Sequence, residues 1–480
     1  MAKRVLILSA SVGSGHNMAA AALEAQFQER DDVGVVTSID VLEATNEAYR
    51  AFYDDAYFKL VKATPWLVGW GYDAGDPPFK LGGSISLWDR INTTDTVRAI
   101  LDFRPTTVVC THFLPLRLVA LLEARGSLNC SLSAVTTDYD FQGLWLTGAF
   151  NRFFVAREET RDHLAAIGVP EDRLVISGIP VRAGLDQPVN AAAVRQRYGL
   201  DPLLPTLLIS AGAAGGPYIT SIVQQVLRMR NPCQAIVVCG RNEQLRADIL
   251  ALVNGSDRFT VLGFTTDMPD LMRVSTLFVG KPGGLSSSEC MAAGLPMVLI
   301  KPIPGQEVRN SDFLLEEGAA VRCNYDTTVG SKMDRLLEQP DKLSSMVEAA
   351  RRIGRPEAAR EIAAAVMADH TRPLWISHAA QRAILWASEK GRNAADVHGS
   401  RRIRQLRRID GESPVALITE EEVGTLEMLA NTSSTGGARL FITLPQLKRR
   451  RRHDRDHADL LLLLRHLMGT HPEVGLTIGS

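Results

Sequence analysis

Short apolar runs rich in β-branched residues alternate with stretches of helical periodicity along most of this 480-residue chain. Alternation of this kind predicts parallel β-sheets with helices on both faces. The predicted strands form two sets: 4–10, 34–39, 106–111, 131–136, 152–156 and 174–177, then 206–210, 235–239, 259–262, 276–279 and 296–300. Predicted helices between them include 18–29, 116–124 and 157–166. We therefore predict an α/β protein with two doubly wound domains that meet near residues 186–190.

The composition excludes several classes of protein. Hydrophobic residues make up 45% and charged residues 22%, as in an ordinary soluble globular protein. The net charge of −1 gives no overall attraction to nucleic acid, and we expect no nucleic-acid partner. No segment reaches the roughly 18 to 20 consecutive apolar residues of a spanning helix, and the apolar run near the start ends too soon for a signal peptide. We expect a cytoplasmic protein whose cysteines, which form no CxxC pair, are reduced thiols: Cys110, Cys130, Cys233, Cys239, Cys290 and Cys323.

Residues 46–90 interrupt the alternation with an aromatic-rich insertion. It contains ten of the chain's 29 aromatic residues, among them Trp66 and Trp70, interleaved with Lys and Arg. Trp and Tyr combine an apolar body with a polar tip, which suits the boundary between membrane and water. The alternative is a helical insertion that buries its aromatic side chains in an ordinary core.

The last part of the chain, 371–480, is basic, with 17 Lys and Arg against 12 Asp and Glu. Basic runs at 401–404 and 448–452 are followed by five consecutive leucines at 460–464. Such a segment can lie on anionic lipid, where each basic residue contributes about 1 kcal/mol. The alternative is a small helical appendage with a solvated basic face.

A first glycine loop, Ser9-Ala10-Ser11-Val12-Gly13-Ser14-Gly15-His16, lies between a predicted strand and a predicted helix. Glycines allow a tight turn and close approach of a ligand to the helix start. It is not a full GxGxxG dinucleotide fingerprint, because position 18 is Met. His16 can accept a proton near neutral pH, which makes it a candidate general base. A capping or packing histidine is the alternative.

A second loop, Gly280-Lys281-Pro282-Gly283-Gly284-Leu285-Ser286-Ser287-Ser288-Glu289, also joins a strand to a helix. Free N–H groups, the positive helix end and serine hydroxyls together suit a diphosphate. Glu289 can accept hydrogen bonds from vicinal hydroxyls such as those of ribose. The alternative is a tight turn capped by serine. The loop lacks the Gly-Lys-Ser/Thr of a P-loop, which argues against an NTPase.

Three further segments place polar or backbone groups at the same sheet edge. Gln306, Glu307 and Asn310 follow a strand and suit sugar hydroxyls, although helix capping would also explain them. Gly212 lies in a glycine-rich turn able to face phosphate. Phe264 ends a strand where backbone groups can pair with the edge of a flat base.

Together these motifs resemble family 28 glycosyltransferases. The matching segments are SxxxGxGH near the start, VCGRN at 238–242, LGF at 262–264, KPGGLSSSE at 281–289, GLP at 294–296 and PIPGQE at 302–307. They are most similar to the monogalactosyldiacylglycerol synthase and processive diacylglycerol glucosyltransferase branch, over about residues 4–368. The resemblance implies a GT-B fold, in which two Rossmann-like domains face each other across a cleft. It also implies a UDP-sugar donor in the second domain, a lipid acceptor at the first, inversion at the anomeric carbon and no metal or other cofactor.

The resemblance assigns roles by position. Gly283, Gly284, Leu285 and Ser286 would contact the diphosphate opposite Gly212. Glu289 would hold the ribose, the Phe264 backbone the uracil, and Gln306, Glu307 and Asn310 the hexose. His16 would deprotonate the acceptor hydroxyl. On the acceptor and membrane side we place Gly15, Asp138, Trp66 and Trp70; Asp138 either orients His16 or contacts the acceptor, and we interpret its Asp-x-Asp motif as a coincidence rather than a metal site.

We therefore expect residues 1–187 to form an acceptor- and membrane-side domain, 188–370 a nucleotide-sugar-binding domain, and 371–480 a basic extension. The expected activity is transfer of glucose or galactose from a UDP-sugar to diacylglycerol, making glycolipid at the inner face of the cell membrane. The alternatives are another GT-B enzyme, with a different lipid acceptor or UDP-sugar epimerase activity, and a non-catalytic UDP-sugar-sensing membrane scaffold. Glucose and galactose differ in the orientation of one hydroxyl, which the sequence does not resolve.

Overall fold

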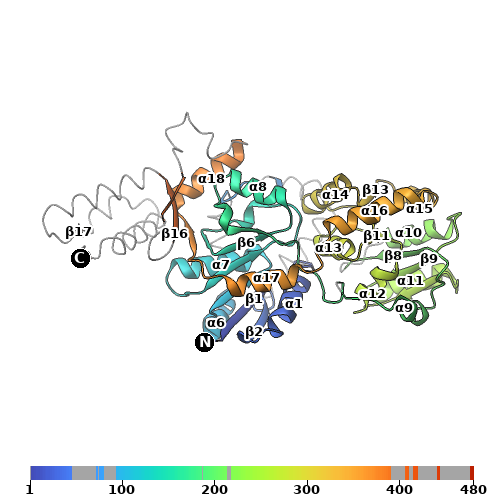
Figure 1. Ribbon diagram of the computed structural model, residues 1–480, viewed down its shortest axis with the longest axis horizontal. Helices are drawn as coiled ribbons and strands as arrows, with labels where there is room; N and C mark the ends of the chain where they lie inside the picture. Colours follow the sequence, from blue (N-terminus) through green and yellow to red (C-terminus); the bar gives the residue numbers. More distant parts are fainter. Residues whose placement is uncertain are drawn as a thin grey trace.

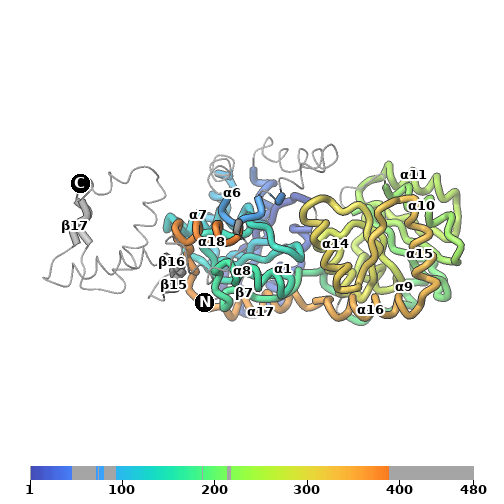
Figure 2. The backbone as a smooth tube through the Cα atoms, turned by 90° about the horizontal axis from the view of Figure 1, so that it is seen from above, coloured from blue at the N-terminus to red at the C-terminus, as the bar shows by residue number. Residues whose placement is uncertain are grey.

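The computed structural model describes residues 2–13, 15–45, 72–73, 75–80, 93–185, 187–212 and 218–390, with the backbone of four short strands beyond them. Trp66 and Trp70 therefore lie outside the described residues, as do the basic runs at 401–404 and 448–452. The described residues form two lobes side by side along the long axis of the molecule (Figures 1 and 2).

The first lobe is built on a six-stranded sheet in which every neighbouring pair of strands is parallel. In spatial order the strands are β2 (Val33–Asp40), β1 (Lys3–Ser9), β3 (Thr107–Cys110), β4 (Ser131–Val135), β6 (Arg152–Val155) and β7 (Leu174–Ile176). The main helices connecting them are α1 (Gly15–Gln28), α6 (Thr94–Phe103), α7 (Phe113–Ala124) and α8 (Glu158–Ala166). Strand β1 lies between β2 and β3, and its residues 5–8 are fully buried because helices cover both faces of a parallel sheet.

The second lobe contains another six-stranded parallel sheet. Its strands are, in spatial order, β10 (Phe259–Leu262), β9 (Gln234–Val238), β8 (Thr206–Ser210), β11 (Leu277–Gly280), β12 (Met297–Ile300) and β13 (Ala320–Cys323). Its helices are α9 (Ala191–Arg197), α10 (Tyr218–Leu227), α11 (Glu243–Val253), α12 (Met268–Val274), α13 (Gly284–Ala292), α14 (Gln306–Glu316), α15 (Val329–Leu337) and α16 (Pro340–Ile353). Counted along the chain, the strand order is 3-2-1-4-5-6, the order of the dinucleotide-binding fold.

The predicted α/β class and the two doubly wound sheets are thus confirmed, and all eleven predicted strands are present with small shifts at their ends. The sequence prediction missed the edge strand β13, whose Ala-Val-Arg-Cys stretch is short and contains a charged residue. It also missed two short strands, β5 (Ala149–Phe150) and β14 (Leu374–Ile376), which pair antiparallel with each other.

The boundaries between the lobes differ from the predicted ones. Ile179, Val181 and Leu185 already pack in the core of the second lobe, so the first crossing lies at the turn before residue 180. The chain returns to the first lobe before α17 (Ala358–Ala368), which lies beside α1 (Figure 1). Ile362 and Val366 of this helix pack with residues of β1 and α1. Residues 358–370 therefore belong to the first lobe by packing, because α17 covers one face of its sheet.

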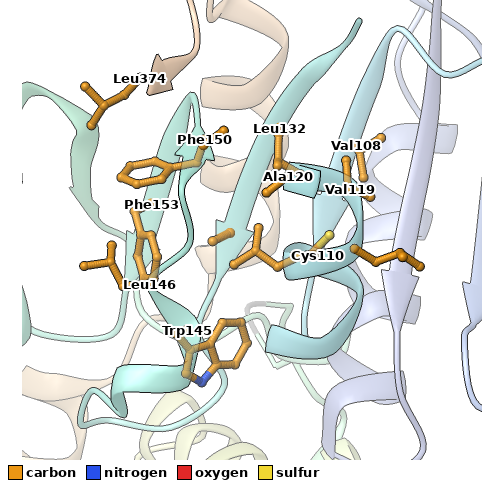
Figure 3. Close-up of a cluster of buried hydrophobic side chains, with 14 of the residues drawn as sticks. Val108, Cys110, Val119, Ala120, Leu132, Trp145, Leu146, Phe150, Phe153 and Leu374 are labelled. Atoms are coloured by element: carbon orange, nitrogen blue, oxygen red, sulfur yellow. The ribbon is translucent and has the colours of Figure 1, made fainter. Parts of the chain in front are cut away.

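The start of the predicted basic extension also completes the first lobe. Strand β14 and helix α18 (His378–Lys390) follow α17, and Leu374 lies beside Phe150 (Figure 3). Leu374 and Ile376 are fully buried in the core that β3, β4 and α7 form. The short strands β15 (Leu406–Ile409) and β16 (Val415–Thr419) continue the β14 sheet, and β17 (Leu440–Thr443) pairs with β18 (Leu476–Gly479).

Among the described residues, no helix has both the length and the apolar character needed to span a membrane. All six cysteines are buried free thiols, as predicted.

Candidate active site

Each sheet reverses its strand order at one point, and the predicted site residues lie at these two points. In the first sheet the reversal falls between β1 and β3. Thr111 directly follows β3, and His16 is the second residue of α1, the helix that follows β1. In the second it falls between β8 and β11, which are followed by Gly212 and by the loop 281–283. Ligands of doubly wound sheets bind at the carboxyl ends of the strands at such reversals. The topology therefore places a candidate half-site in each lobe.

The two half-sites meet across the junction between the lobes. A Cβ atom added at Gly284, the first residue of α13, would lie 1.9 Å from the carbonyl oxygen of Thr137. A Cβ added at Gly15, the first residue of α1, would lie 3.8 Å from Cβ of Leu285. In Figure 1, α13 and α14 lie on the side of the second lobe that faces the first. The two glycine loops are thus brought together, and Gly284 permits an approach that no side chain would allow.

The hydrogen bonds of His16 fix its tautomer. Its Nδ1 lies 2.9 Å from the carbonyl oxygen of Thr111 and 2.8 Å from Oγ1 of Thr137. A carbonyl oxygen only accepts, so Nδ1 carries the proton and donates it, which leaves the lone pair on Nε2. Among the described residues, no hydrogen-bond partner reaches Nε2. Neutral His16 is therefore arranged to accept a proton through Nε2.

Two opposing effects act on the pKa of His16. Burial lowers it, because removal from water disfavours the imidazolium, while the negative charges of Asp138 and Asp40 and the bond to Thr111 raise it. The neighbouring His112 ring meets His16 edge-on, with centroids 4.6 Å apart. Burial and the proximity of His16 keep the pKa of His112 well below its usual value, and its Nδ1 accepts from the N–H of Leu114 at 3.2 Å. His112 is thus a neutral capping residue of α7, whereas His16 is available for proton transfer.

The loop at 137–140 connects His16 to the second lobe. Asp138 Oδ1 accepts a hydrogen bond from Nδ2 of Asn310 at 2.9 Å. Burial raises the pKa of Asp138 above its usual range, against the opposing effects of this bond and of His16. Asn310 is fully buried and was predicted to contact the hexose, but its amide is bonded to the loop and to Pro282. Asp140, the second acid of the Asp-x-Asp motif, lies 3.4 Å from Arg309.

The predicted diphosphate segment forms the start of α13. Gly283 is the N-cap residue, and no side chain caps this end among the described residues. The first N–H groups of a helix have no partner within the helix, and together with the helix dipole they form an anion site. Leu285 is buried, Ser286 is half-buried and Lys281 lies just before the helix. Gly212, which follows β8, has a φ of 66°, a left-handed conformation that favours glycine.

Glu289, the predicted ribose ligand, is buried and ion-paired. Arg182 donates to its two carboxylate oxygens, from Nε at 2.5 Å and from a terminal nitrogen at 2.7 Å. Sequence reasoning missed Arg182, because nothing local indicates that an arginine after the Gly178-Ile179-Pro180 turn reaches a helix 107 residues away. The pair engages both carboxylate oxygens of Glu289 and places the Arg182 cation beside the donor half-site.

Gln306 and Glu307 begin α14, beside the diphosphate segment. Glu307 Oε2 accepts from the N–H of Ile303 at 2.7 Å, and its Oε1 faces Gly283. Burial raises the pKa of Glu307, an effect that the charge of Lys281 opposes. The Gln306 side chain is half-buried and has no hydrogen-bond partner within the described ranges. This turn therefore offers an amide and a carboxyl group next to the helix that would hold the diphosphate.

Phe264 lies at the far end of the donor half-site. It follows β10, and its side chain is 65% exposed. The guanidinium carbon of Arg241 lies 5.2 Å from the centroid of its ring. Arg241 belongs to the Val-Cys-Gly-Arg-Asn segment, but the sequence did not indicate that it stacks on Phe264. The flat ring and guanidinium suit a nucleotide base.

The described end of the aromatic insertion also reaches the junction. The Tyr72 ring lies against Gly305, where an added Cβ would be 2.7 Å from Cγ of Tyr72. Arg309 stacks over the same ring at 5.0 Å and forms ion pairs with Asp76 at 3.0 Å and Asp73 at 3.3 Å. Burial and the charge of Asp138 raise the pKa of Tyr72. The sequence favours either a membrane contact or burial in an ordinary core for this insertion. Its described residues 72–73 and 75–80 instead contact both lobes near the start of α14.

No cluster of three His, Cys, Asp or Glu side chains suited to a metal ion occurs among the described residues. Asp138 and Asp140 are instead bonded to Asn310 and Arg309.

Comparisons with known proteins agree with this architecture. The family described as monogalactosyldiacylglycerol (MGDG) synthase matches residues 16–181, and group 1 glycosyl transferases match residues 213–353. Proteins named processive diacylglycerol beta-glucosyltransferase from Bacillus mycoides (strain KBAB4) and Bacillus cereus (strain G9842) are each 30% identical over 382 residues, 77% of this chain and 95% of theirs.

Among solved structures, UDP-GlcNAc 2-epimerase from Neisseria meningitidis bound to UDP-GlcNAc has a TM-score of 0.51 at 13% identity, over 76% of this chain and 100% of that one. The Staphylococcus aureus MnaA–UDP structure has a TM-score of 0.50 at 12% identity, over 76% and 96%. These similarities concern the fold alone. With its GT-B fold, the chain belongs to the monogalactosyldiacylglycerol synthase and processive diacylglycerol glucosyltransferase branch of glycosyltransferase family 28.

Proposed function

We propose that this protein transfers a hexose from a UDP-sugar to the hydroxyl of diacylglycerol, with inversion at the anomeric carbon. The observation that carries the proposal is the position of His16, whose Nε2 is available beside the start of α13. The names of the Bacillus relatives support the same acceptor and reaction.

The proposed chemical step is a single displacement. The diacylglycerol hydroxyl gives its proton to Nε2 of His16 as its oxygen forms a bond to the anomeric carbon. The bond from that carbon to the UDP oxygen breaks on the opposite face, so the configuration inverts. General base catalysis of this kind contributes typically 10²- to 10⁴-fold to a rate.

The departing UDP gains negative charge, which the start of α13 is placed to stabilise. Its free N–H groups and the positive end of its dipole act at the diphosphate without reorganising during the reaction. Lys281 and Arg182 add positive charge at either side of this helix. We propose that these groups serve the leaving diphosphate without a metal ion.

The other residues that would bind the UDP-sugar are assigned by their positions in the second lobe. Glu289 would accept from the ribose hydroxyls, and the Phe264 backbone would pair with the uracil beside Arg241. Gln306 and Glu307 would bind the hexose hydroxyls at the start of α14.

A product assay tests this proposal. Purified protein is incubated with each of several UDP-sugars and with diacylglycerol vesicles, and the lipid fraction is analysed by mass spectrometry. Formation of a hexosyl diacylglycerol is expected, and the donor that yields it identifies the hexose as glucose or galactose. Absence of a lipid product with every donor would contradict the proposal, and interconversion of the UDP-sugars would favour an epimerase.

We also propose that the enzyme acts at the inner face of the cell membrane, docked through Trp66 and Trp70 on anionic lipid. The support is chemical: the acceptor is a membrane lipid, and the sequence combines aromatic and basic segments. In vesicle sedimentation, the Trp66→Ala/Trp70→Ala variant should bind several-fold more weakly than the unmodified protein. The unmodified protein should also bind neutral vesicles more weakly than anionic ones, because each lost contact of a basic residue with anionic lipid costs about 1 kcal/mol of binding free energy. Equal binding of both proteins to both vesicle types would contradict this docking.

A further inference from the structure

The loop Thr137–Tyr139 connects the candidate base directly to the donor lobe. Thr137 bonds to Nδ1 of His16 through Oγ1 at 2.8 Å, and its carbonyl oxygen faces Gly284 at the start of α13. Tyr139 accepts a hydrogen bond from Ser288 of α13 at its hydroxyl, at 3.1 Å. The position of His16 is therefore linked to the donor lobe through three consecutive residues of one loop.

Asn310 of α14 holds the middle of this loop. Its Nδ2 donates to Asp138 Oδ1 at 2.9 Å and to the carbonyl oxygen of Pro282 at 3.1 Å. Its Oδ1 accepts from the N–H of Tyr139 at 2.9 Å. Both donor hydrogens and the oxygen of this fully buried amide are thus engaged. One side chain therefore fixes a carboxylate of the first lobe and the loop preceding α13 at the same time.

We infer that Asn310 is a positioning residue, which holds the loop at 137–139 and its Asp138 carboxylate in place, so that the donor lobe positions the catalytic base His16. This inference rests on the proposed function and deepens it. It replaces the expectation that Asn310 contacts the hexose, because both amide hydrogens are donated within the protein and the side chain is fully buried. The neighbouring Gln306, whose amide has no partner among the described residues, is the better candidate for that contact.

Asn310 can change the pKa of His16 through the charged groups that surround this histidine. His16 is faced by Asp138, Asp40 and His112, and Asp138 in turn by Asp140, Tyr72 and Glu307. A negative Asp138 stabilises the imidazolium that forms when His16 takes the acceptor proton. The bond from Asn310 favours the ionised form of Asp138 against the effect of burial.

Removal of the Asn310 amide should change the pH dependence of the reaction in one direction. Without the Asn310 amide, the pKa of Asp138 rises and less of it is ionised at a given pH. His16 then loses a stabilising anion, and its pKa falls. Because the reaction needs neutral His16, the acidic limb of the pH profile moves to lower pH.

The experiment compares the pH dependence of kcat for the unmodified enzyme, Asn310→Ala, Asp138→Asn and the double variant. Asp138→Asn keeps an oxygen that accepts from Asn310 but removes the charge. We expect the acidic limb to move down in both single variants, by on the order of one pH unit or less. In the Asp138→Asn background, Asn310→Ala should cause no additional shift, because no charge remains to be positioned.

A matched control is Asn231→Ala, in another part of the second lobe. It removes an amide that donates a hydrogen bond to the Asp334 carboxylate at 2.8 Å. It should leave the acidic limb unchanged. UDP affinity by calorimetry and the thermal unfolding midpoint report whether each variant is folded. If Asn310→Ala does not fold, the inference is tested with Asp138→Asn alone. An acidic limb of the kcat profile at the same pH as in the unmodified enzyme would then overturn the inference.

Two results with folded proteins would overturn the inference. One is an unmoved limb in Asn310→Ala with a raised KM for the UDP-sugar, which identifies a sugar ligand. The other is an equal shift by Asn310→Ala in both backgrounds, which shows that Asp138 is not the group it acts through. Failure of the proposed function is distinguishable, since the unmodified enzyme would then form no glycolipid at all.

Discussion

At the scale of single residues, the sequence locates the groups that follow strands but not their long-range partners. His16, Gly212 and Glu289 could be predicted because each belongs to a loop or helix start directly after an apolar run. Arg182 and Tyr72 could not, because their roles depend on contacts with helices 107 and more than 200 residues away. The sequence places Asn310 at the candidate site but does not predict its hydrogen bond to Asp138, since a local pattern cannot show that an amide bonds across a domain junction.

The Arg182–Glu289 pair yields a prediction at this scale. Arg182→Gln leaves the buried Glu289 carboxylate without its cation, which should lower the free energy of unfolding by about 3 kcal/mol. Urea denaturation measures this loss, and calorimetry should show weaker UDP binding. The double variant with Glu289→Gln should recover part of the stability, because no buried charge then remains. A single variant as stable as the unmodified protein would contradict the assigned pair.

At the scale of elements, the alternation of strands and helices predicts two parallel sheets. The points where the strand order reverses indicate where in each sheet the candidate site lies. The short strands β5, β13 and β14 were missed because two to four residues carry too little pattern, and their pairing is decided by neighbours. The junction of α13 with the loop at 137–139 is likewise a tertiary feature. It depends on a glycine whose missing side chain leaves room for a backbone carbonyl.

Gly284→Ala tests the junction at the scale of these elements. The added Cβ would lie 1.9 Å from the Thr137 carbonyl oxygen, so α13 and the loop must separate. We expect kcat to fall by roughly 100-fold, since a displacement of about 1 Å can have this effect on a positioned reaction. Steady-state kinetics measure the fall, and near-ultraviolet circular dichroism checks that the protein remains folded. Unchanged kcat in a folded variant would show that the contact does not position the reacting groups.

At the scale of the whole molecule, the chain crosses between the lobes twice, and its later part completes the first lobe. The sequence places a boundary at residue 370 because the family resemblance ends there. Helices α17 and α18 and strand β14 nevertheless pack on the first lobe, since their apolar faces cover its sheet. Residues 371–390 are therefore part of the catalytic body's core rather than an independent appendage.

Leu374 tests this assignment. Leu374→Ala removes a fully buried side chain beside Phe150, which should lower the free energy of unfolding by about 2 to 5 kcal/mol (Figure 3). The control is Leu203→Ala, where the side chain is 88% exposed and a change within about 0.5 kcal/mol is expected. Chemical denaturation of both variants provides the comparison. Equal stability of the two would show that β14 does not contribute to the core.

The central claim is that His16 is the general base for transfer of a hexose to diacylglycerol. The most direct measurement is the rate of glycolipid formation by the His16→Ala variant, at saturating UDP-sugar and diacylglycerol, alongside its affinity for UDP. We predict a rate lower by about 10²- to 10⁴-fold with unchanged UDP affinity, because the donor half-site lies in the other lobe. A variant that forms glycolipid at the rate of the unmodified enzyme would contradict the claim.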